Sequence, residues 1–462
     1  MDDVSFPDSY PMVLKRLKQL ERKLERSPEL YRNVRKQIEE YQTKEYAHEA
    51  TEEELRTADP KKVWYLPLNV VLNPKKPDKV RLIWDAAAMV QGISLNSMLL
   101  KGPDLLVPLV SVLLNFRERR IAFGGDFREM YHQMKMIAKD KSAQWFRNNS
   151  AKEPKVYVMN VATFGSTSSP ASAQYVKNRN AEEHAGQFPE AAMAIIKRHY
   201  VDDYFDSVDT IEEAVERAKQ VRFIHKRAGF DIRNWVSNSL EVLTALWDAK
   251  PGGAVVFNHD KQKSNERVLG VIWEQENVAF AFSATPRPEM QVYLCGEKRP
   301  TKRNVLSCVM GFFDPLGLLS PFTIHGKMLV QHLWRSGCEW DHQIDEHGWN
   351  QWQPWIGLLP KVEELRIPRC CLGDAESSSV ESLELHIFTD ARKHAYGCVA
   401  YLRSVVNGEL NCNLVMSRAK VAPLKRQSIS RLELMAAVPG ARLSRTTTII
   451  ILITLLEVLK LN

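Results

Sequence analysis

Hydrophobic residues in the first 45 positions recur at intervals of three and four, with Lys and Arg between them. This spacing places them on one face of an α-helix. The first stripe comprises Leu14, Leu17, Leu20 and Leu24, and the second comprises Leu30, Val34, Ile38 and Tyr41. Ser27-Pro28-Glu29 separates the stripes and supplies an N-cap and a first-turn proline. The pattern predicts an N-terminal helical segment over residues 1–60, with an amphipathic hairpin that carries no chemistry of its own.

Beyond residue 61 the hydrophobic pattern changes to short apolar runs that are broken by Pro and Gly. Residues 64–71 and 79–84 are predicted strands on either side of a Pro-rich turn at 73–78. Helical spacing returns over residues 211–230. Because strands and helices mix without a regular alternation, the fold class is predicted to be α+β.

Composition adds few constraints. The 462 residues predict more than one domain, and 44% hydrophobic with 26% charged residues is typical of a soluble globular protein. Seven cysteines at irregular spacing without a Cys-x-x-Cys pair predict free thiols rather than a zinc site or a disulfide framework. The N-terminal residues have no signal-peptide core, and the longest apolar run, 449–456, is far shorter than a membrane span. We therefore expect no membrane partner.

Three aspartates are the strongest candidates for chemistry. Asp202 and Asp203 follow Tyr200-Val201 between the apolar runs 194–196 and 204–205, which predicts a hairpin tip. A second predicted strand, 120–126, ends on Asp126. Carboxylates held together repel one another unless a cation joins them. Nucleotidyl transfer uses two Mg²⁺ ions bridged by aspartates from neighbouring strands. We therefore predict that Asp126, Asp202 and Asp203 are catalytic and hold two Mg²⁺ ions, with Mn²⁺ as the alternative.

A Tyr-x-Asp-Asp motif alone is a weak signal, but the surrounding segments give it context. The segments are 79–82, 124–133, 164–171, 200–203, 229–235, 269–273, 301–306 and 314–321. In this order and spacing they resemble the reverse transcriptases of BEL/Pao-type LTR retrotransposons, over about residues 5–445. The resemblance implies an RNA-directed DNA polymerase that extends a primer 3′-hydroxyl with dNTPs on an RNA or DNA template.

The same resemblance assigns further roles, residue by residue. The nucleotide-binding residues that it implies are Lys79, Arg81, Phe127, Tyr131 and Gly165, and the primer-grip residues are Leu269, Gly270 and Trp273. Lys79 and Arg81 would contact the triphosphate, and Tyr131 would act as the steric gate against a 2′-hydroxyl. At Phe164 many retroviral enzymes have a glutamine, so a side-chain hydrogen bond to the nucleotide is not expected there. Gly165 is either a close-approach glycine or a plain turn glycine.

The resemblance also implies a domain order. It predicts a right-hand polymerase with fingers and palm over 61–245, a thumb and primer-grip region over 246–300, and a connection-like region over 301–378. An incomplete RNase H-like α/β domain would follow over 379–462. The acidic, Ser-rich stretch 372–382 is predicted to be a flexible linker between the last two. The tryptophans between 334 and 355 fit a core or an interdomain seam better than base stacking.

A second carboxylate site is predicted to be vestigial. Asp390 ends a predicted strand and Glu433 begins a predicted helix, and they match the first two of the four carboxylates that an RNase H domain uses. The third and fourth are not recognisable. Pro439 interrupts the helix, and the residues after Arg445 resemble no part of RNase H. We expect a truncated domain with an aberrant, β-prone tail that favours aggregation, and no RNase H activity.

Local charge supports a nucleic-acid partner more than the net charge does. A formal charge of +7 is mild, but basic clusters at 75–81, 117–120 and 298–303 could follow a template-primer backbone. Two other functions remain open: a catalytically silent nucleic-acid-binding remnant, and another palm-type nucleotidyl transferase such as a cyclase. The expected location is the cytoplasm, within a virus-like particle, with the nucleus as the alternative.

Overall fold

The structure is a computed structural model that describes residues 5–73, 76–141, 145–148, 154–246, 266–285 and 287–459. Contacts divide the chain into two compact units. The first unit comprises Met1–Leu106, Phe127–Gly186 and Phe223–Ile232, and the second comprises Val107–Asp126, Gln187–Arg222 and Arg233–Asn462. Residues 61–245, the predicted fingers and palm, are divided between both units. The predicted domain boundaries therefore stay predictions.

The first unit begins with the predicted helical hairpin, α1 (Tyr10–Glu25) and α2 (Pro28–Thr43). The apolar stripe of α2 is buried, whereas in the stripe of α1 Leu17 and Leu24 are buried and Leu14 and Leu20 are partly buried. α2 packs into a core that also contains Trp64 and Trp84. β3 (Leu68–Asn73) and β4 (Lys76–Trp84) form the predicted antiparallel hairpin, with Val71 opposite Arg81. The two helices and this hairpin therefore confirm the periodicity.

The other elements of the first unit surround this core. A second sheet has the strand order β1 (Ala47–Glu49), β7 (Lys155–Met159), β6 (Trp145–Asn148) and β2 (Tyr65–Leu66). The helices are α3 (Glu52–Thr57), α4 (Leu95–Met98), η1 (Met130–Gln133), α6 (Ala138–Lys141) and α7 (Ser169–His184). Within the segment 164–171, α7 begins at Ser169.

The second unit contains the sheet that carries the three aspartates. Its strand order is β10 (Ile232–Ser237), β5 (Ile121–Phe127), β9 (Asp203–Val208) and β8 (His199–Tyr200). Nearby helices are α5 (Leu109–Phe116), α8 (Pro189–Lys197), α9 (Ile211–Arg227) and α10 (Leu240–Leu246). The apolar run 194–196 lies in α8 and not in a strand, so only two residues form the strand before the Asp pair.

A second sheet of this unit joins segments that are distant in sequence. Its order is β11 (Glu266–Val268), β12 (Val271–Glu274), β13 (Ala279–Ala281) and β14 (Arg366–Pro368). The helices between β13 and β14 are η4 (Pro288–Met290), α11 (Gln291–Leu294), α12 (Lys302–Val309), α13 (Ser320–Arg335), α14 (Glu346–Ile356) and α15 (Leu359–Glu364). Trp352 and Trp355 of α14 are buried, as predicted, whereas Trp334 and Trp340 are partly exposed.

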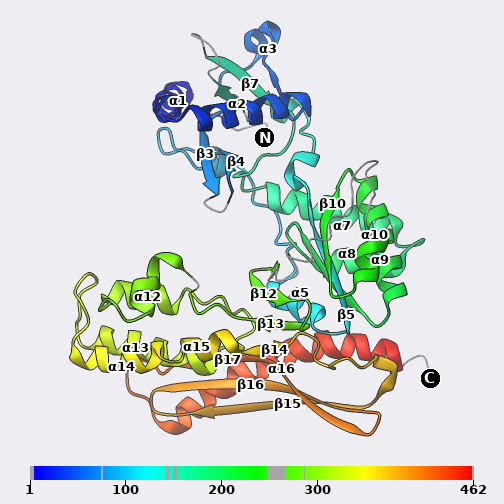
Figure 1. Cartoon of the computed structure of the whole chain (residues 1–462). Helices are drawn as coiled ribbons and strands as arrows, with labels where there is room; N and C mark the ends of the chain where they lie inside the picture. Colours follow the sequence, from blue (N-terminus) through cyan, green and yellow to red (C-terminus); the bar gives the residue numbers. More distant parts are fainter. Residues whose placement is uncertain are drawn as a thin grey trace. The chain divides into compact units, whose positions relative to one another are not determined.

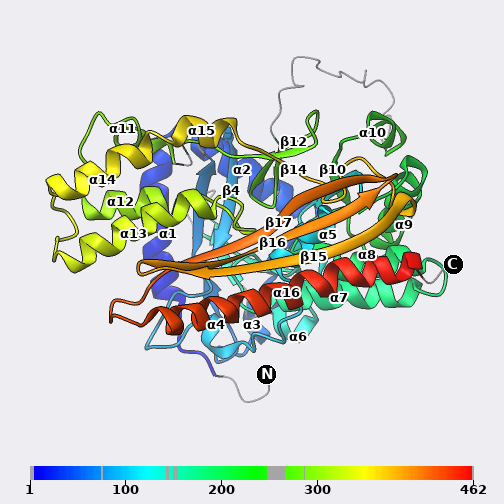
Figure 2. The same cartoon turned by 90° about the horizontal axis from the view of Figure 1, so that it is seen from below.

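The C-terminal part is a three-stranded antiparallel sheet with one long helix. β15 (Val380–Ala391), β16 (Ala395–Val406) and β17 (Glu409–Val421) pair in chain order, and α16 (Ile429–Leu459) runs along β15 and β16 (Figures 1 and 2). Gly440 of α16 packs directly on Thr389 of β15. Residues 446–459 continue this helix, so the prediction of a β-prone tail is wrong.

The predicted flexible linker at 372–382 is also wrong. Ser377, in η5 (Ser377–Ser379), is buried and its hydroxyl donates to Asp209 Oδ1 at 3.0 Å. Glu376 pairs with Arg120 at 2.6 Å. Glu376 and Glu381, two of the acidic residues that suggested a solvated linker, instead bind basic or polar groups of the same unit. One buried core therefore extends from Val112 through Trp273 to Val415 and Leu443.

Two further expectations can be compared with the structure. All seven cysteines are free, as predicted. Among the helices in the described parts of the chain, none combines the length and the apolar character needed to cross a membrane.

Candidate active site

The Asp pair lies at the end of a tight hairpin, as predicted. Tyr200 of β8 pairs with Asp203 of β9, so Val201 and Asp202 alone form the turn. Val201 has a φ of 58°, a left-handed conformation that is costly for a β-branched residue. Asp202 is exposed at the tip and Asp203 is half-buried at the start of β9. The strained turn thus holds two adjacent carboxylates at one edge of the sheet.

The third carboxylate reaches the same place through strand pairing. β5 runs antiparallel to β9, and Asp126 lies directly opposite Asp203 in the register. The pKa of Asp203 is raised to about 7, chiefly by burial and then by the negative charges of Asp202 and Asp126. The structure therefore brings together Asp126, Asp202 and Asp203 from segments about 75 residues apart in sequence.

The three carboxylates have a donor chemistry that suits a hard divalent cation. Their mutual repulsion, which after burial is the second cause of the raised pKa of Asp203, would be relieved by such an ion. Within the parts of the chain that the structure describes, however, no group of three or more His, Cys, Asp or Glu side chains is already arranged to hold a metal ion.

The strand beside β5 explains where the Asp126 side chain is held. Asn234 of β10 donates its amide to Asp126 Oδ1 at 2.6 Å, and Arg233 Nε lies 3.6 Å from Asp126 Oδ2. Asn234 has a φ of 52°, a left-handed conformation that Asn tolerates better than most residues. The segment 229–235 is part of the family resemblance, but the resemblance implied no role for Arg233 or Asn234. The strained polar residue could have been suspected only from the register of β10 against β5.

A buried ionic network supports β9 from its other face. Tyr204 and Asp206 alternate with Asp203 along the strand and therefore point away from it. Asp206 is fully buried, accepts a hydrogen bond from Arg198, and accepts another from Tyr204 Oη at 2.7 Å. Arg217 lies 3.8 Å from the same carboxylate. This paired charge fixes the strand on which Asp203 is carried, because breaking a buried pair is costly.

The predicted nucleotide-binding residues lie in the first unit. Arg81 is exposed on β4, and the side chain of Lys79 lies outside the described residues. Tyr131 is half-buried, and its ring meets Phe164 edge-on at 4.9 Å. Phe127 is 2% exposed and stacks on Phe230 at 5.1 Å. Any contact between Phe127 and a nucleotide must therefore use its backbone, which the sequence did not indicate.

Gly165 is explained by the protein itself. Its φ is 104°, and a Cβ at this position would overlap the carbonyl oxygen of Trp84. Asn96 clamps the same loop, because its amide donates to Gly165 O at 2.9 Å and accepts from Thr167 N at 2.8 Å. The structure thus supports the turn-glycine alternative, and Asn96 is a positioning residue that the sequence analysis missed.

The predicted primer-grip segment forms a hairpin, as expected. β11 and β12 pair through Val268 and Val271, so Leu269 and Gly270 form a two-residue turn with φ of 50° and 87°. Positive φ at both positions is the requirement of a type I′ turn. Trp273 is fully buried and meets Phe116 edge-on at 5.0 Å. Neither its indole nor the Leu269 side chain, which is buried in the same core, can reach a primer, so this part of the prediction is wrong and only the exposed Gly270 and the turn backbone are available.

The predicted RNase H residues are close to one another in the fold. Asp390 is exposed near the end of β15, opposite Gly397 of β16, and Glu433 is exposed in the first turns of α16. Their neighbours Ala391 and Leu432 belong to one buried cluster. Because Thr389 and Ala391 face α16, strand alternation places the Asp390 side chain on the opposite face of β15.

Comparison with known proteins separates two parts of the chain. Residues 301–458 match the sequence model of the family described as "Pao retrotransposon-like RNaseH-like domain". The match covers the predicted connection-like region together with the RNase H-like region, and it extends through the segment after Arg445. The expectation that this segment resembles no part of the domain is therefore wrong. No curated protein sequence matches the chain significantly.

Solved structures of foamy viral protease-reverse transcriptase are similar in fold. The form described as dRH in complex with ds DNA has a TM-score of 0.54 at 13% identity, over 89% of this chain and 60% of that one. The forms with RNA/DNA hybrid and with dsDNA both have a TM-score of 0.53 at 13% identity, over 90% of this chain and 46% and 71% of theirs. The chain thus spans about half to two-thirds of these relatives, shares their fold, and carries a Pao-type RNase H-like region.

Proposed function

We propose that the chain is the RNA-directed DNA polymerase of a BEL/Pao-type retroelement. The register that sets Asp126 opposite Asp203, beside Asp202 in the hairpin turn, is the observation that carries the proposal. Carboxylates from adjacent strands are what two-metal nucleotidyl transfer needs. The fold shared with viral protease-reverse transcriptase and the Pao-type match support the same reading.

Asp126, Asp202 and Asp203 would hold the divalent ions, with Mg²⁺ as the physiological choice. When bound, the ions lower the pKa of the primer 3′-hydroxyl and neutralise charge on the triphosphate. The protein's part is to hold the carboxylates. Asn234 and Arg233 orient Asp126, the strained turn presents Asp202, and the Asp206 network anchors β9 beneath Asp203.

The substrate assignments outside the carboxylates follow from the family resemblance. Arg81 is exposed and available to a triphosphate, and Tyr131 would stand beside the sugar as the steric gate. The turn Leu269-Gly270 would face the primer. RNA and DNA template-primers and dNTPs are the proposed ligands. We further propose that RNase H activity is absent, because only Asp390 and Glu433 match the carboxylates of such a site.

Extension of oligo-dT on poly-rA with Mg²⁺ tests the proposal. The polymerase reading predicts incorporation of dTTP that is lost on Asp202→Asn. A chain that binds the template-primer but incorporates nothing would instead be the catalytically silent remnant, the second reading that the sequence left open.

A further inference from the structure

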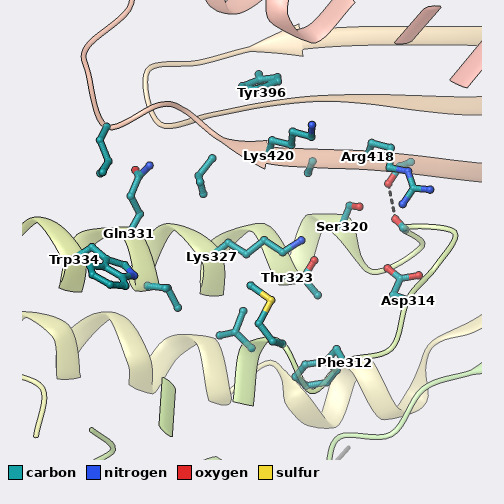
Figure 3. Close-up of a pocket in the computed structure, with 18 residues that line it drawn as sticks. Phe312, Asp314, Ser320, Thr323, Lys327, Gln331, Trp334, Tyr396, Arg418 and Lys420 are labelled. Atoms are coloured by element: carbon teal, nitrogen blue, oxygen red, sulfur yellow. Dashed lines mark hydrogen bonds between the residues drawn. The ribbon is translucent and has the colours of Figure 1, made fainter. Parts of the chain in front are cut away.

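A large pocket opens in the C-terminal part of the second unit, between α13 and β17. Its volume is about 910 Å³, at the upper end of the range for small-molecule sites. α13 contributes Thr323, Lys327 and Gln331, which are spaced one helical turn apart, and β17 contributes Arg418 and Lys420 from one face of the strand (Figure 3). None of its lining residues belongs to the carboxylate site.

The pocket carries an excess of positive charge. Lys327, Arg418 and Lys420 are cationic, whereas Asp314 is the one acidic residue that lines it, so the formal sum is +2. Asp314 is already engaged, because its carboxylate accepts from Leu318 N at 2.8 Å and from Leu319 N at 2.7 Å. Among the residues that the structure describes, no carboxylate oxygen lies within 4.0 Å of any of the three cationic groups. Burial raises the pKa of the Asp314 carboxyl and the nearby Arg418 charge opposes that rise, so the charge of Arg418 is partly offset, whereas the charges of Lys327 and Lys420 are left for a ligand.

The remaining walls suit a nucleotide chain. Ser320 and Thr323 offer hydroxyl groups, and Met310, Phe312 and Val330 provide an apolar floor. Two aromatic side chains, Tyr396 and Trp334, stand at the rim, and Trp334 is 49% exposed. Lys302 Nζ lies 3.8 Å from the centre of the Trp334 ring, and Trp340 contacts the same indole in a T-shaped arrangement at 5.1 Å, so only the exposed part of the Trp334 side chain is available for stacking. Cations beside exposed aromatic rings are the usual equipment of proteins that bind single-stranded nucleic acid.

We propose that this pocket binds one strand of nucleic acid, with Lys327, Arg418 and Lys420 on successive phosphates and Tyr396 and Trp334 beside the bases. The choice of ligand class rests on the proposed function, but the residues are separate from the polymerase site. The contacts are to the backbone and to the flat faces of bases, so binding is independent of sequence. The pocket thus gives the region matched by the Pao-type family a nucleic-acid contact that needs neither Asp390 nor Glu433.

Site-specific photo-crosslinking on the full chain tests this directly. A benzophenone side chain replaces Met310, which lines the pocket and is 51% exposed, and irradiation follows addition of a labelled single-stranded oligonucleotide in EDTA. We expect a crosslinked band. In the same background, Lys327→Gln with Lys420→Gln should lower its yield by at least about fivefold, and the dependence of log affinity on log salt should become shallower by about 1.4, or 0.7 for each lost phosphate contact.

A matched variant controls for the loss of charge. Lys361→Gln removes an exposed lysine from α15 that does not line the pocket, and it should leave the crosslink unchanged. Equal crosslinking by the double variant, with circular dichroism showing that both variants are folded, would overturn the proposal. If micromolar inorganic tripolyphosphate abolished the crosslink, the proposal would also be overturned, because the pocket would then be a site for free phosphate compounds.

The outcome is distinguishable from failure of the polymerase proposal. Asp202→Asn should lose primer extension and keep the Met310 crosslink, since the crosslinking assay contains no metal. A chain that never extends a primer but still crosslinks through Lys327 and Lys420 would contradict the polymerase reading alone. A chain that extends primers but gives no crosslink would contradict the pocket alone.

Discussion

The carboxylate of Asp126 has two polar partners within the protein. Asn234 donates to one of its oxygens at 2.6 Å and Arg233 lies near the other. Partners of this kind orient metal-binding carboxylates, and their loss typically costs 10- to 100-fold in affinity or activity. Asn234 has a left-handed φ of 52°, a conformation that glycine adopts without strain. A glycine variant therefore removes the side-chain amide and keeps the backbone conformation.

We predict that Asn234→Gly lowers the rate of primer extension by about 10- to 100-fold while the chain stays folded. Asn234→Ala should lower the rate similarly and also destabilise the protein by about 1 kcal/mol, because alanine is strained at positive φ. Steady-state extension and thermal unfolding of both variants check this. An unchanged rate in the glycine variant would show that the hydrogen bond to Asp126 has no part in positioning.

The buried side chain of Lys177 makes the stability of the protein depend on pH. It lies on α7, fully buried, and its Nζ has no hydrogen-bond partner among the described residues. Burial lowers the pKa of Lys177 from 10.5 to about 7. Between these values the unfolded chain binds the proton and the folded protein does not. This residue therefore makes stability rise with pH from about 7 to 10.5, and that gain is lost as the pH falls towards 7.

We predict that Lys177→Met raises the free energy of unfolding at pH 7 and flattens its increase between pH 7 and pH 9. Methionine keeps the length of the side chain and removes the buried charge. Urea unfolding at both pH values measures the effect, and Lys226→Met, an exposed lysine of α9, is the control that should change neither value. A parallel pH dependence in wild type and Lys177→Met would contradict the assignment.

The residues that sequence reasoning found and missed differ in a physical way. Asp126, Asp202 and Asp203 were predicted because their neighbours are apolar strands and the motif is local. Asn234 and Asn96 were missed because their partners are set by strand register and loop packing. Trp273 and Phe127 were assigned to ligands although both are buried, since an aromatic residue within a motif does not reveal which way it points.

At the scale of elements, periodicity predicted α1, α2 and α9 and the hairpin of β3 and β4. It failed at α8, where residues 194–196 are apolar enough for either a strand or a buried helix. It also failed in α16, whose apolar tail continues a helix although it is β-prone on its own. In α16, tertiary packing overrides local propensity, because the helix lies along β15 and β16.

Adjacent residues of α16 give opposite predictions. Pro439 lies inside the helix, where a proline costs about 3 kcal/mol, so Pro439→Ala should raise the unfolding temperature. Gly440 packs so closely on Thr389 that a Cβ would overlap the threonine methyl group. Gly440→Ala should therefore destabilise the protein by about 1–3 kcal/mol through overpacking and lower the unfolding temperature. Calorimetry of the two variants compares them. Equal shifts of the same sign would mean that α16 does not pack on β15 in this way.

At the scale of the whole molecule, the second unit is tied together by two buried arginines. Arg117 donates to backbone carbonyls of Pro368, Arg369 and Leu414, and Arg369 donates to those of Arg119 and Arg120. These bonds join α5, β14 and β17, which the sequence assigned to three domains. Long-range bonds of this kind leave no pattern in a single sequence, which is why the linker prediction failed.

We predict that the full chain does not cleave the RNA of a labelled RNA/DNA hybrid in Mg²⁺, because only Asp390 and Glu433 match the required carboxylates. Asp390→Asn should therefore change neither the amount of intact RNA in the hybrid nor the rate of primer extension. Mg²⁺-dependent cleavage that is lost in Asp390→Asn would show that the missing ligands come from residues not recognised in the sequence.

The most direct test of the account is primer extension by the purified chain on poly-rA and oligo-dT with Mg²⁺. We predict incorporation of dTTP that falls by at least about 100-fold in Asp126→Asn and in Asp202→Asn, with a smaller loss in Asp203→Asn. Asp374→Asn, an exposed aspartate of the same unit, should extend primers as the wild type does. Extension that survives in Asp126→Asn and Asp202→Asn, or that is absent from the folded wild type, would contradict the proposed polymerase.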